Sequence, residues 1–294
     1  MRAKFQEMRG KWRYLQGLPG FRRAPATTLF RLLRWRLHCA LGIPATVTLS
    51  PWGVRFFLPA RWRGAGTTMI FAVGAHYERE LAYLHRFVAP GMVVVDGGAN
   101  CGIYTVLAAR LVGSSGRVLS FEPGAEAFSV LKKNIKLNHL VNVRAHCAAL
   151  TDRDGRARLY HHERGPNSFS IAHSENMAIE SEHVVTRTLD EVFREENAGR
   201  LGLIKLDVEG AEELVLRGAG QVIADSCPTI LFEINVPAAK QLGLHPYGAW
   251  ELLRYWGYRF FSLTGCEDLR ELDQPLRSVA IQNVIAVHGK RWKL

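Results

Sequence analysis

The stretch from Val93 to Gly102 constrains the fold of this chain more than any other. It begins with an apolar run that suits a parallel strand buried on both faces, and Asp96 stands where that strand should end. The glycines that follow allow a sharp turn and bring backbone amide groups close to a ligand. A helical pattern over Ile103–Leu111 comes next, so its unpaired N–H groups and positive dipole end face the loop. The stretch predicts a strand–loop–helix unit that binds a small molecule.

Strands and helices alternate after this unit, which predicts a doubly wound, mostly parallel α/β sheet with right-handed crossovers. We expect the last two strands to be antiparallel to each other. The expected strands are 117–121, 141–147, 156–161, 203–206, 229–232, 258–263 and 283–287. The expected helices are 77–88, 125–138, 188–195, 210–217 and 247–256.

The positive charge of the chain is concentrated near its N-terminus. Residues 1–63 contain 13 Lys and Arg and a single acid, Glu7, for a net charge of +12, while the remainder carries 25 Lys and Arg against 26 acids. Such a segment can meet nucleic acid, anionic lipid or another acidic surface. We therefore expect a basic N-terminal extension over 1–75 and a separate domain over 76–294.

Within the extension we expect a helix over 27–41, a β-hairpin over 46–58 and a loop over 61–68. The helix carries apolar residues on one side and arginines between them. It could be a basic amphipathic helix at a membrane interface. The preferred alternative is a helix docked on the domain with its arginines extending into solvent. The apolar residues in question are Leu29, Phe30, Leu33 and Leu37.

The cysteines and the hydropathy pattern bear on the cellular location. The chain has five cysteines, an odd number, without a CxxC pair or a zinc-binding pattern, which favours buried thiols in a reducing compartment. We find neither the apolar core of a signal peptide nor a run of about 18 apolar residues. We expect a cytoplasmic protein. The basic segment could also bring it to the surface of an anionic membrane. The cysteines are Cys39, Cys101, Cys147, Cys227 and Cys266.

Acidic residues around the glycine loop favour S-adenosylmethionine over a dinucleotide. Asp96 precedes the glycines, where a carboxylate would repel a pyrophosphate but suits an ammonium or sulfonium group. Glu122 follows Gly102 by twenty residues, at the end of the next strand, where a carboxylate can accept both hydroxyls of a ribose. Ala99 replaces the second glycine of the dinucleotide fingerprint. The helix start near Thr105 would take the carboxylate of the cofactor.

Further motifs make the resemblance specific. Four motifs follow the loop in this order along the chain: Phe121-Glu122-Pro123, Thr188-Leu189-Asp190, Ile204-Lys-Leu-Asp-Val-Glu-Gly-Ala-Glu212 and Ile230-Leu-Phe-Glu-Ile234. This set resembles the FkbM family of S-adenosylmethionine-dependent methyltransferases over roughly residues 76–288. Gly97 stands where a branched residue is common, and Cys101 where Val or Ile is common. The resemblance implies a Rossmann-like class I methyltransferase. It also implies methylation of a hydroxyl on a sugar, glycoconjugate or secondary metabolite.

The predicted site lies at the ends of the strands. Removing the proton of an aliphatic hydroxyl benefits from a general base. Asp207 and Glu209 are the predicted catalytic residues, with Asp207 contacting cofactor or acceptor and Glu209 orienting the acceptor or acting as the base. A plain helix-terminal acid is the alternative for Glu209. The predicted cofactor contacts are Asp96, Gly97, Gly98, Ala99, Asn100, Gly102, Thr105, Glu122, Ala149, Ser168 and Asp207.

Rival interpretations concern a metal and the acceptor. Asp207, Glu233 and Asn235 end successive strands and could hold Mg²⁺, although a metal-free site is preferred and no metal ligand is predicted. The basic segment invites a nucleic-acid methyltransferase. The absence of an Asn/Asp-Pro-Pro-Tyr motif argues against it, so we expect a small-molecule or glycan acceptor. A non-catalytic adapter is a further rival, against which the intact acidic strand ends argue.

Overall fold

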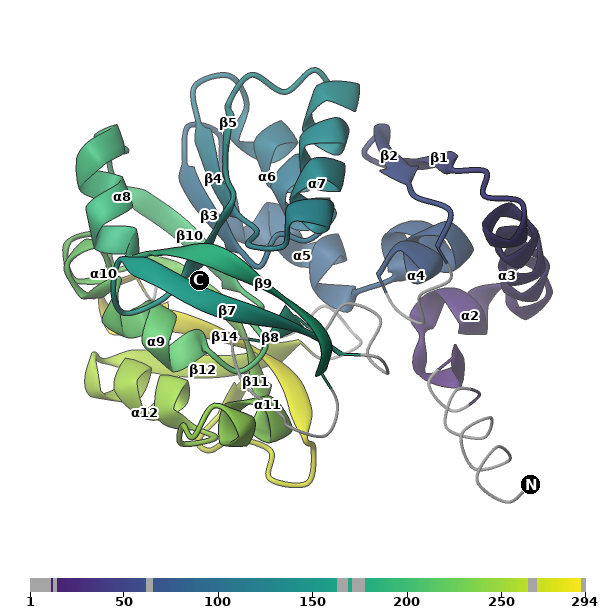
Figure 1. Ribbon diagram of the computed structural model, residues 1–294. Coiled ribbons are helices and arrows are strands. Elements are labelled where there is room, and N and C mark those ends of the chain that lie inside the picture. Colours follow the sequence, from purple (N-terminus) through teal and green to yellow (C-terminus); the bar gives the residue numbers. More distant parts are fainter. Residues whose placement is uncertain are drawn as a thin grey trace. The chain divides into compact units, whose positions relative to one another are not determined.

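The structure is a computed structural model that describes residues 12, 15–61, 66–162, 169–170, 178–263 and 269–291 (Figure 1). The chain forms two compact units, Met1–Tyr83 and Leu84–Leu294, with the boundary inside helix α5 (Arg79–Phe87). The predicted division after residue 75 falls before this helix. No helix in the described parts of the chain has both the length and the apolar character needed to cross a bilayer.

The first unit combines short helices with the predicted β-hairpin. Its elements are α2 (Pro19–Arg23), α3 (Pro25–Ala40), β1 (Ala45–Leu49), β2 (Val54–Leu58), α4 (Thr67–Val73) and the 3₁₀ helix η1 (Gly74–His76). Strands β1 and β2 pair antiparallel. Helix α3 begins at Pro25, because proline suits the first position of a helix. The predicted loop over 61–68 is wrong at its end, since α4 begins at Thr67 and all its residues are buried.

Helix α3 packs through a different side from the one predicted. Trp35 and Thr28 are its buried residues, whereas the apolar residues expected to dock are exposed. The indole of Trp35 stacks on Phe71 of α4 at 4.8 Å between ring centroids. The docked-helix interpretation was therefore wrong about which side of α3 is buried. A small core joins the helices of this unit: Leu18, Phe21, Met69, Ala72 and Val73.

The second unit is built on one large sheet with the strand order β13-β12-β14-β11-β10-β3-β4-β5. The run from β11 to β5 is parallel, whereas β14 pairs antiparallel with both β11 and β12, and β13 with β12. The strands are β3 (Val93–Gly97), β4 (Arg117–Phe121), β5 (Val143–His146), β10 (Leu201–Leu206), β11 (Thr229–Asn235), β12 (Tyr258–Leu263), β13 (Leu269–Leu272) and β14 (Ile281–His288). The predicted doubly wound sheet with late antiparallel strands is confirmed.

Chain direction across the sheet places the site. From β3 the chain proceeds to β4 and β5 on one side, and from β10 to β11 on the other, so the order reverses between β3 and β10. Open α/β sheets bind ligands beyond the carboxyl ends of the strands at such a point. Right-handed crossovers put the connecting helices on opposite faces, and Figure 1 shows α6 and α7 away from α8 and α10. The helices are α6 (Ile103–Val112), α7 (Ala125–Leu137), α8 (Leu189–Glu196), α9 (Glu212–Arg217), α10 (Gly220–Ser226), α11 (Val236–Gln241), α12 (Gly248–Tyr255) and the 3₁₀ helix η2 (Gly289–Arg291).

A second, smaller sheet has the order β6-β9-β7-β8. It comprises β6 (Ala148–Leu150), β7 (Gly155–His162), β8 (Phe169–Ser170) and β9 (Ala178–Arg187). The expected strand over 141–147 corresponds to β5, which pairs with β4 in the main sheet; β6, which pairs with β9 in the small sheet, begins after Cys147 and was not predicted. Strands β8, β9 and β13 and helices α10 and α11 were not predicted.

The core and the caps explain why the elements form where they do. Apolar residues from β3, β4, β10, β11 and α12 share one continuous core, including Val95, Leu119 and Trp250. The Thr188-Leu-Asp motif has a structural role: the Thr188 hydroxyl accepts from the N–H of Glu191 at 3.4 Å and caps α8. Both carboxylate oxygens of Asp190 accept N–H groups at the start of α10.

Candidate active site

The glycine loop between β3 and α6 is fastened to the end of β4. The N–H groups of Gly98 and Ala99 both donate to the carbonyl of Phe121, at 3.0 and 2.9 Å. Gly102, at φ +87°, is the N-cap residue of α6, and a left-handed conformation there favours glycine. Backbone hydrogen bonds therefore hold the start of the loop against the end of β4.

Gly98 also brings the loop against the end of β10. Its φ is +74°, and a Cβ atom built on it would collide with the carbonyl of Asp207. The N–H of Asp207 in turn donates to the carbonyl of Gly97 at 3.0 Å. These contacts place the cofactor loop directly beside the predicted catalytic strand end.

Asp96 is buried beneath the loop, with only 1% of its surface exposed. It accepts hydrogen bonds from the hydroxyl of Thr105, at 2.6 Å, and from the N–H of the same residue. The Thr105 hydroxyl lies 2.8 Å from the Ser120 hydroxyl. Thr105 thus holds Asp96 at the start of α6, and its own side chain is fully buried.

Lys205 is the cation between the acids. In β10 it is paired in register with Asp96 of β3, and its Nζ atom lies 3.9 Å from Asp96 Oδ1 and 3.3 Å from Asp207 Oδ2. The same atom lies 4.8 Å from the ring centroid of Tyr104. Burial raises the pKa of Asp96, and the lysine charge opposes that rise. Oδ1 of Asp96 has no hydrogen-bond partner within the described part of the chain.

Glu122 lies at the end of β4, as predicted, and is 4% exposed. Its Oε2 accepts the N–H of Asn100 at 2.7 Å and its Oε1 accepts the N–H of Gly124 at 2.9 Å. Burial raises its pKa to about 7, against the effect of these hydrogen bonds. The carboxylate therefore fastens the loop at Asn100, whose φ is +50°, in addition to any contact with a ribose.

Four carboxyl groups lie near the carboxyl ends of β10 and β11: Asp207, Glu209 and Glu212 follow β10, and Glu233 lies in the last part of β11. The Nδ2 atom of Asn235 donates to Glu233 at 3.0 Å and to Glu209 at 3.3 Å, so one amide joins two acids. Glu212 accepts the N–H groups of Val208 and Gly210, which shapes the turn between β10 and α9. We call these four residues the carboxylate cluster.

The carboxylate cluster carries perturbed acids. Burial raises the pKa of Glu209 to about 8, and the charges of Asp207 and Glu212 add to the effect. Burial raises the pKa of Glu212 to about 8 as well, and burial together with the neighbouring acids raises that of Glu233. The side chain of Asp207 is 40% accessible. Acids poised near neutral pH are suited to proton transfer.

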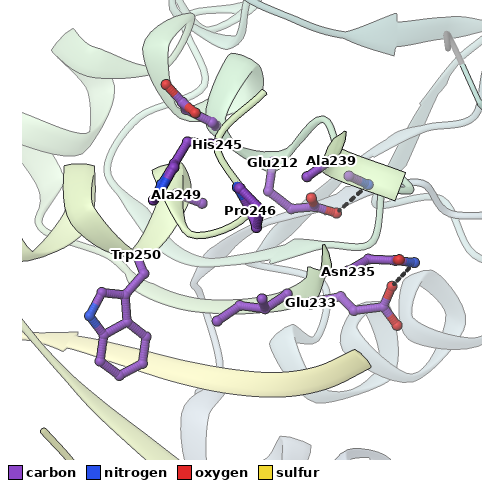
Figure 2. A pocket seen from close by; sticks show the side chains of 11 residues that line it. Glu212, Glu233, Asn235, Ala239, His245, Pro246, Ala249 and Trp250 are labelled. Atoms are coloured by element: carbon purple, nitrogen blue, oxygen red, sulfur yellow. Dashed lines mark hydrogen bonds between the residues drawn. The ribbon is translucent and has the colours of Figure 1, made fainter. Parts of the chain in front are cut away.

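A pocket with about 260 Å³ of empty space, its open side included, adjoins the carboxylate cluster (Figure 2). Figure 2 shows Glu212 and Glu233 on one part of its wall and His245, Pro246 and Trp250 on another. Its acids come from α9 and β11, and the part of its wall formed by α12 and the segment before it carries mostly apolar residues together with His245. The pocket is narrow, and beside the perturbed acids it leaves room for a molecule of about the size of water.

The other predicted site residues are placed as follows. Gly97 ends β3 against Leu206, and the side chain of Ala149 packs with Leu159 and Val184 in the small sheet. Ser168 lies outside the described residues. The oxygen of Asn235 accepts the N–H of Ala238 and caps α11, so it serves the helix rather than facing Asp207. No group of three or more His, Cys, Asp and Glu positioned to hold a metal ion occurs in the described ranges.

Sequence reasoning missed Lys205, Glu212 and Ser120 as parts of the site. Lys205 could have been identified from the sequence, because a lysine inside the otherwise apolar run Leu201–Leu206 needs a charged partner. The sequence evidence for Glu212 is weaker: it is the third acid of the Asp207–Glu212 stretch. The sequence gives no evidence for Ser120, since a buried serine in a strand has no distinctive spacing.

Comparison with known proteins gives the family. The model of the methyltransferase FkbM domain matches residues 96–260. The chain belongs to this family. The match confirms the predicted resemblance to the FkbM methyltransferase family.

Relatives match over part of their length. Methyltransferase 1 of Beauveria bassiana (strain ARSEF 2860) is 26% identical over 159 residues, 48% of this chain and 64% of that protein. Methyltransferase sdnD of Sordaria araneosa is 27% identical over 157 residues, 44% of this chain and 60% of that protein. The chain thus spans less than two thirds of the length of these curated relatives.

Solved structures are similar at a lower level. Methyltransferase FkbM from Methylobacillus flagellatus KT has a TM-score of 0.44 and 13% identity, over 88% of this chain and 59% of that one. The O-methyltransferase from Bacillus cereus, solved in complex with SAH, has a TM-score of 0.41 and 14% identity, over 70% and 77%.

Proposed function

We propose that this FkbM chain transfers a methyl group from S-adenosylmethionine to a hydroxyl of a sugar, glycoconjugate or secondary metabolite. One observation carries the proposal: Glu209, with a pKa raised to about 8, lies in a carboxylate cluster that adjoins both the glycine loop and a pocket. An acid of that pKa is a good base near neutral pH, and a hydroxyl acceptor requires one.

The donor side fits S-adenosylmethionine by charge. Two carboxyl groups, those of Asp96 and Asp207, face the single ammonium group of Lys205, an excess of acids that suits an ammonium or sulfonium group. Oδ1 of Asp96, which accepts no hydrogen bond within the described residues, is the kind of acceptor that a positively charged ligand satisfies. When bound, the cofactor supplies an electrophilic methyl group for in-line attack.

On the acceptor side the residues hold and deprotonate a hydroxyl. Asn235 orients the carboxylates of Glu209 and Glu233 through its amide hydrogens, and Glu209 takes the hydroxyl proton. Asp207 contacts the bound molecules at the end of β10. Positioning of the two reactants beside each other provides most of the remaining rate enhancement. The acceptor hydroxyl would enter beside Trp250 and His245, which line this pocket.

The test is a transfer assay with labelled S-adenosylmethionine and a panel of sugars, glycolipids and hydroxylated metabolites, read by mass spectrometry. A gain of one CH₂ in a single acceptor class supports the proposal. Cofactor binding by calorimetry, with methylation of none of these classes, would contradict the acceptor part. A divalent chelator is added in a parallel arm: unchanged turnover removes the Mg²⁺ alternative, whereas loss that Mg²⁺ restores supports it.

A further inference from the structure

Helix α3 exposes a continuous apolar stripe, which we define as Leu29, Phe30, Leu33, Leu37 and Leu41. Phe30 is 64% exposed, Leu33 69% and Leu37 59%. Positions 30, 33, 37 and 41 recur at intervals of three and four residues, so their side chains share one side of the helix. Ile43, 50% exposed, continues the stripe beyond the helix end.

The opposite side of α3 is already occupied. Trp35 is completely buried, and its indole N–H donates to the hydroxyl of Thr68 at 3.1 Å. Its ring stacks on Phe71. This packing fixes the rotation of the helix within its unit, so the apolar stripe is a stable surface of that unit. Several large apolar residues on one exposed side indicate an interaction surface.

Arginines border the apolar stripe. At about 100° per residue, Arg34 falls at one edge and Arg36 at the other. Both are exposed, as is Arg31. The sequence contains no Asp or Glu between Glu7 and Glu78, so the stripe has no acidic neighbour along the chain in this region.

We propose that α3 lies in the interface of an anionic lipid bilayer, with the apolar stripe inserted below the headgroups and the arginines beside lipid phosphates. An amphipathic helix with a basic polar side and Leu and Phe on the other side is the arrangement that binds such an interface. Nucleic acid would pair with the arginines and leave the leucines exposed to water. A second copy would bring the two sets of arginines together without acids to pair with them.

The experiment is sedimentation of the full chain with lipid vesicles. Vesicles of phosphatidylcholine with phosphatidylserine are compared with phosphatidylcholine alone, at about 0.1 M salt and at higher salt, because screening weakens the electrostatic part. The wild type is expected to bind the anionic vesicles about tenfold more tightly than the neutral ones. Leu33→Ser/Leu37→Ser is expected to weaken binding by about tenfold or more, since binding scales with inserted apolar area. Arg31→Gln/Arg36→Gln is expected to weaken it at low salt.

Matched controls lie in the other unit. Val141→Ser removes a side chain that is 93% exposed, and Arg110→Gln/Lys136→Gln removes two exposed charges; neither should change vesicle binding. Circular dichroism confirms folding, and sedimentation without lipid reports the oligomeric state. Equal binding by Leu33→Ser/Leu37→Ser and the wild type would overturn the proposal. A dimer abolished by that variant would favour a second copy instead, and salt-dependent binding to nucleic acid without binding to vesicles would favour that partner.

Discussion

Lys205 and Asp96 lie opposite each other on adjacent parallel strands, in register, with 3.9 Å between Nζ and Oδ1. Both are buried, and the lysine also reaches Asp207 at 3.3 Å. A buried charge that loses its partner is strongly destabilising, because nothing replaces the hydration it gave up on folding. This pair therefore ties the stability of the domain to the electrostatics of the cofactor site.

Lys205→Met should lower the free energy of unfolding by about 3–5 kcal/mol near neutral pH. The loss should be smaller at about pH 5, because burial raises the pKa of Asp96 and the lysine no longer opposes its protonation. Urea denaturation at both pH values measures this. The exposed Lys136→Met is the control and should change stability by less than about 0.5 kcal/mol. An equal loss at both pH values would contradict the explanation.

Gly98→Ala should disrupt the loop, because the added Cβ would collide with the carbonyl of Asp207 and φ is +74°. We expect a loss of about 3 kcal/mol or more in stability, together with loss of cofactor binding by calorimetry. Gly113→Ala is the matched control: its φ is +67° and nothing lies within 4 Å of the added atom. It should cost about 1–3 kcal/mol from backbone strain alone, because its ψ of −170° lies in a region that is essentially restricted to glycine. Equal effects of the two variants would argue against the close approach.

Glu122→Ala should weaken S-adenosylmethionine binding by about 1.5–3 kcal/mol, the scale of hydrogen bonds to a charged group. The carboxylate could act through the ribose or through its hydrogen bond to Asn100. Calorimetry with S-adenosylhomocysteine and its 2′-deoxy analogue separates the two roles. If Glu122 holds the ribose, the wild type discriminates between these ligands and the variant does not. If the variant still discriminates between the two ligands, Glu122 acts only by fastening the loop.

Glu209→Gln should lower kcat by about 10²–10⁴-fold once an acceptor is known, because the base is removed while the amide keeps its shape. The wild-type rate should rise as pH increases toward about 8, the pKa of Glu209, and the variant should lose this rise. Glu251→Gln, whose parent side chain is 64% exposed, is the control. A variant that retains the rise with full activity would show that another group takes the proton.

Glu212→Gln tests the buried carboxyl groups through the pH dependence of stability. The folded-state pKa of Glu212, about 8, is above its ordinary value of 4.5, so the folded protein binds more protons between these values. Stability should therefore fall as pH rises through that window, by up to about 1.4 kcal/mol per pH unit for each such group. Urea denaturation between about pH 5 and pH 8 should show a shallower fall for the variant. Histidine titrations affect both proteins alike and cancel in the comparison. A fall of the same steepness in both proteins would place the proton uptake elsewhere.

The sequence predicted the main sheet well because its strands are apolar and its turns carry glycine or proline. It predicted β9 poorly, because Ala178–Arg187 mixes Glu, Ser and His with few apolar residues, and its strand conformation comes from pairing with β7. Helix α4 was missed for the opposite reason. Its residues are buried all round, so no amphipathic period marks the helix.

In the candidate site, the sequence predicted where the acids lie but not which residues contact them. The positions of Asp96, Glu122 and Asp207 followed from strand ends, because parallel strands bring their carboxyl ends to one edge. The partners of these acids did not follow. Thr105 was expected beside the cofactor but holds Asp96, and Asn235 joins Glu209 to Glu233 through an amide that no spacing rule indicates.

The hydrogen bond from Asp207 N–H to the carbonyl of Gly97 is made entirely by main-chain atoms. No side-chain replacement at either residue removes its donor or acceptor, apart from proline at Asp207. The main chain of the sheet thus sets the distance between the glycine loop and Asp207. If the proposed function holds, substitution of pocket residues such as His245 and Trp250 would change the acceptor and leave the distance over which the methyl group is transferred the same.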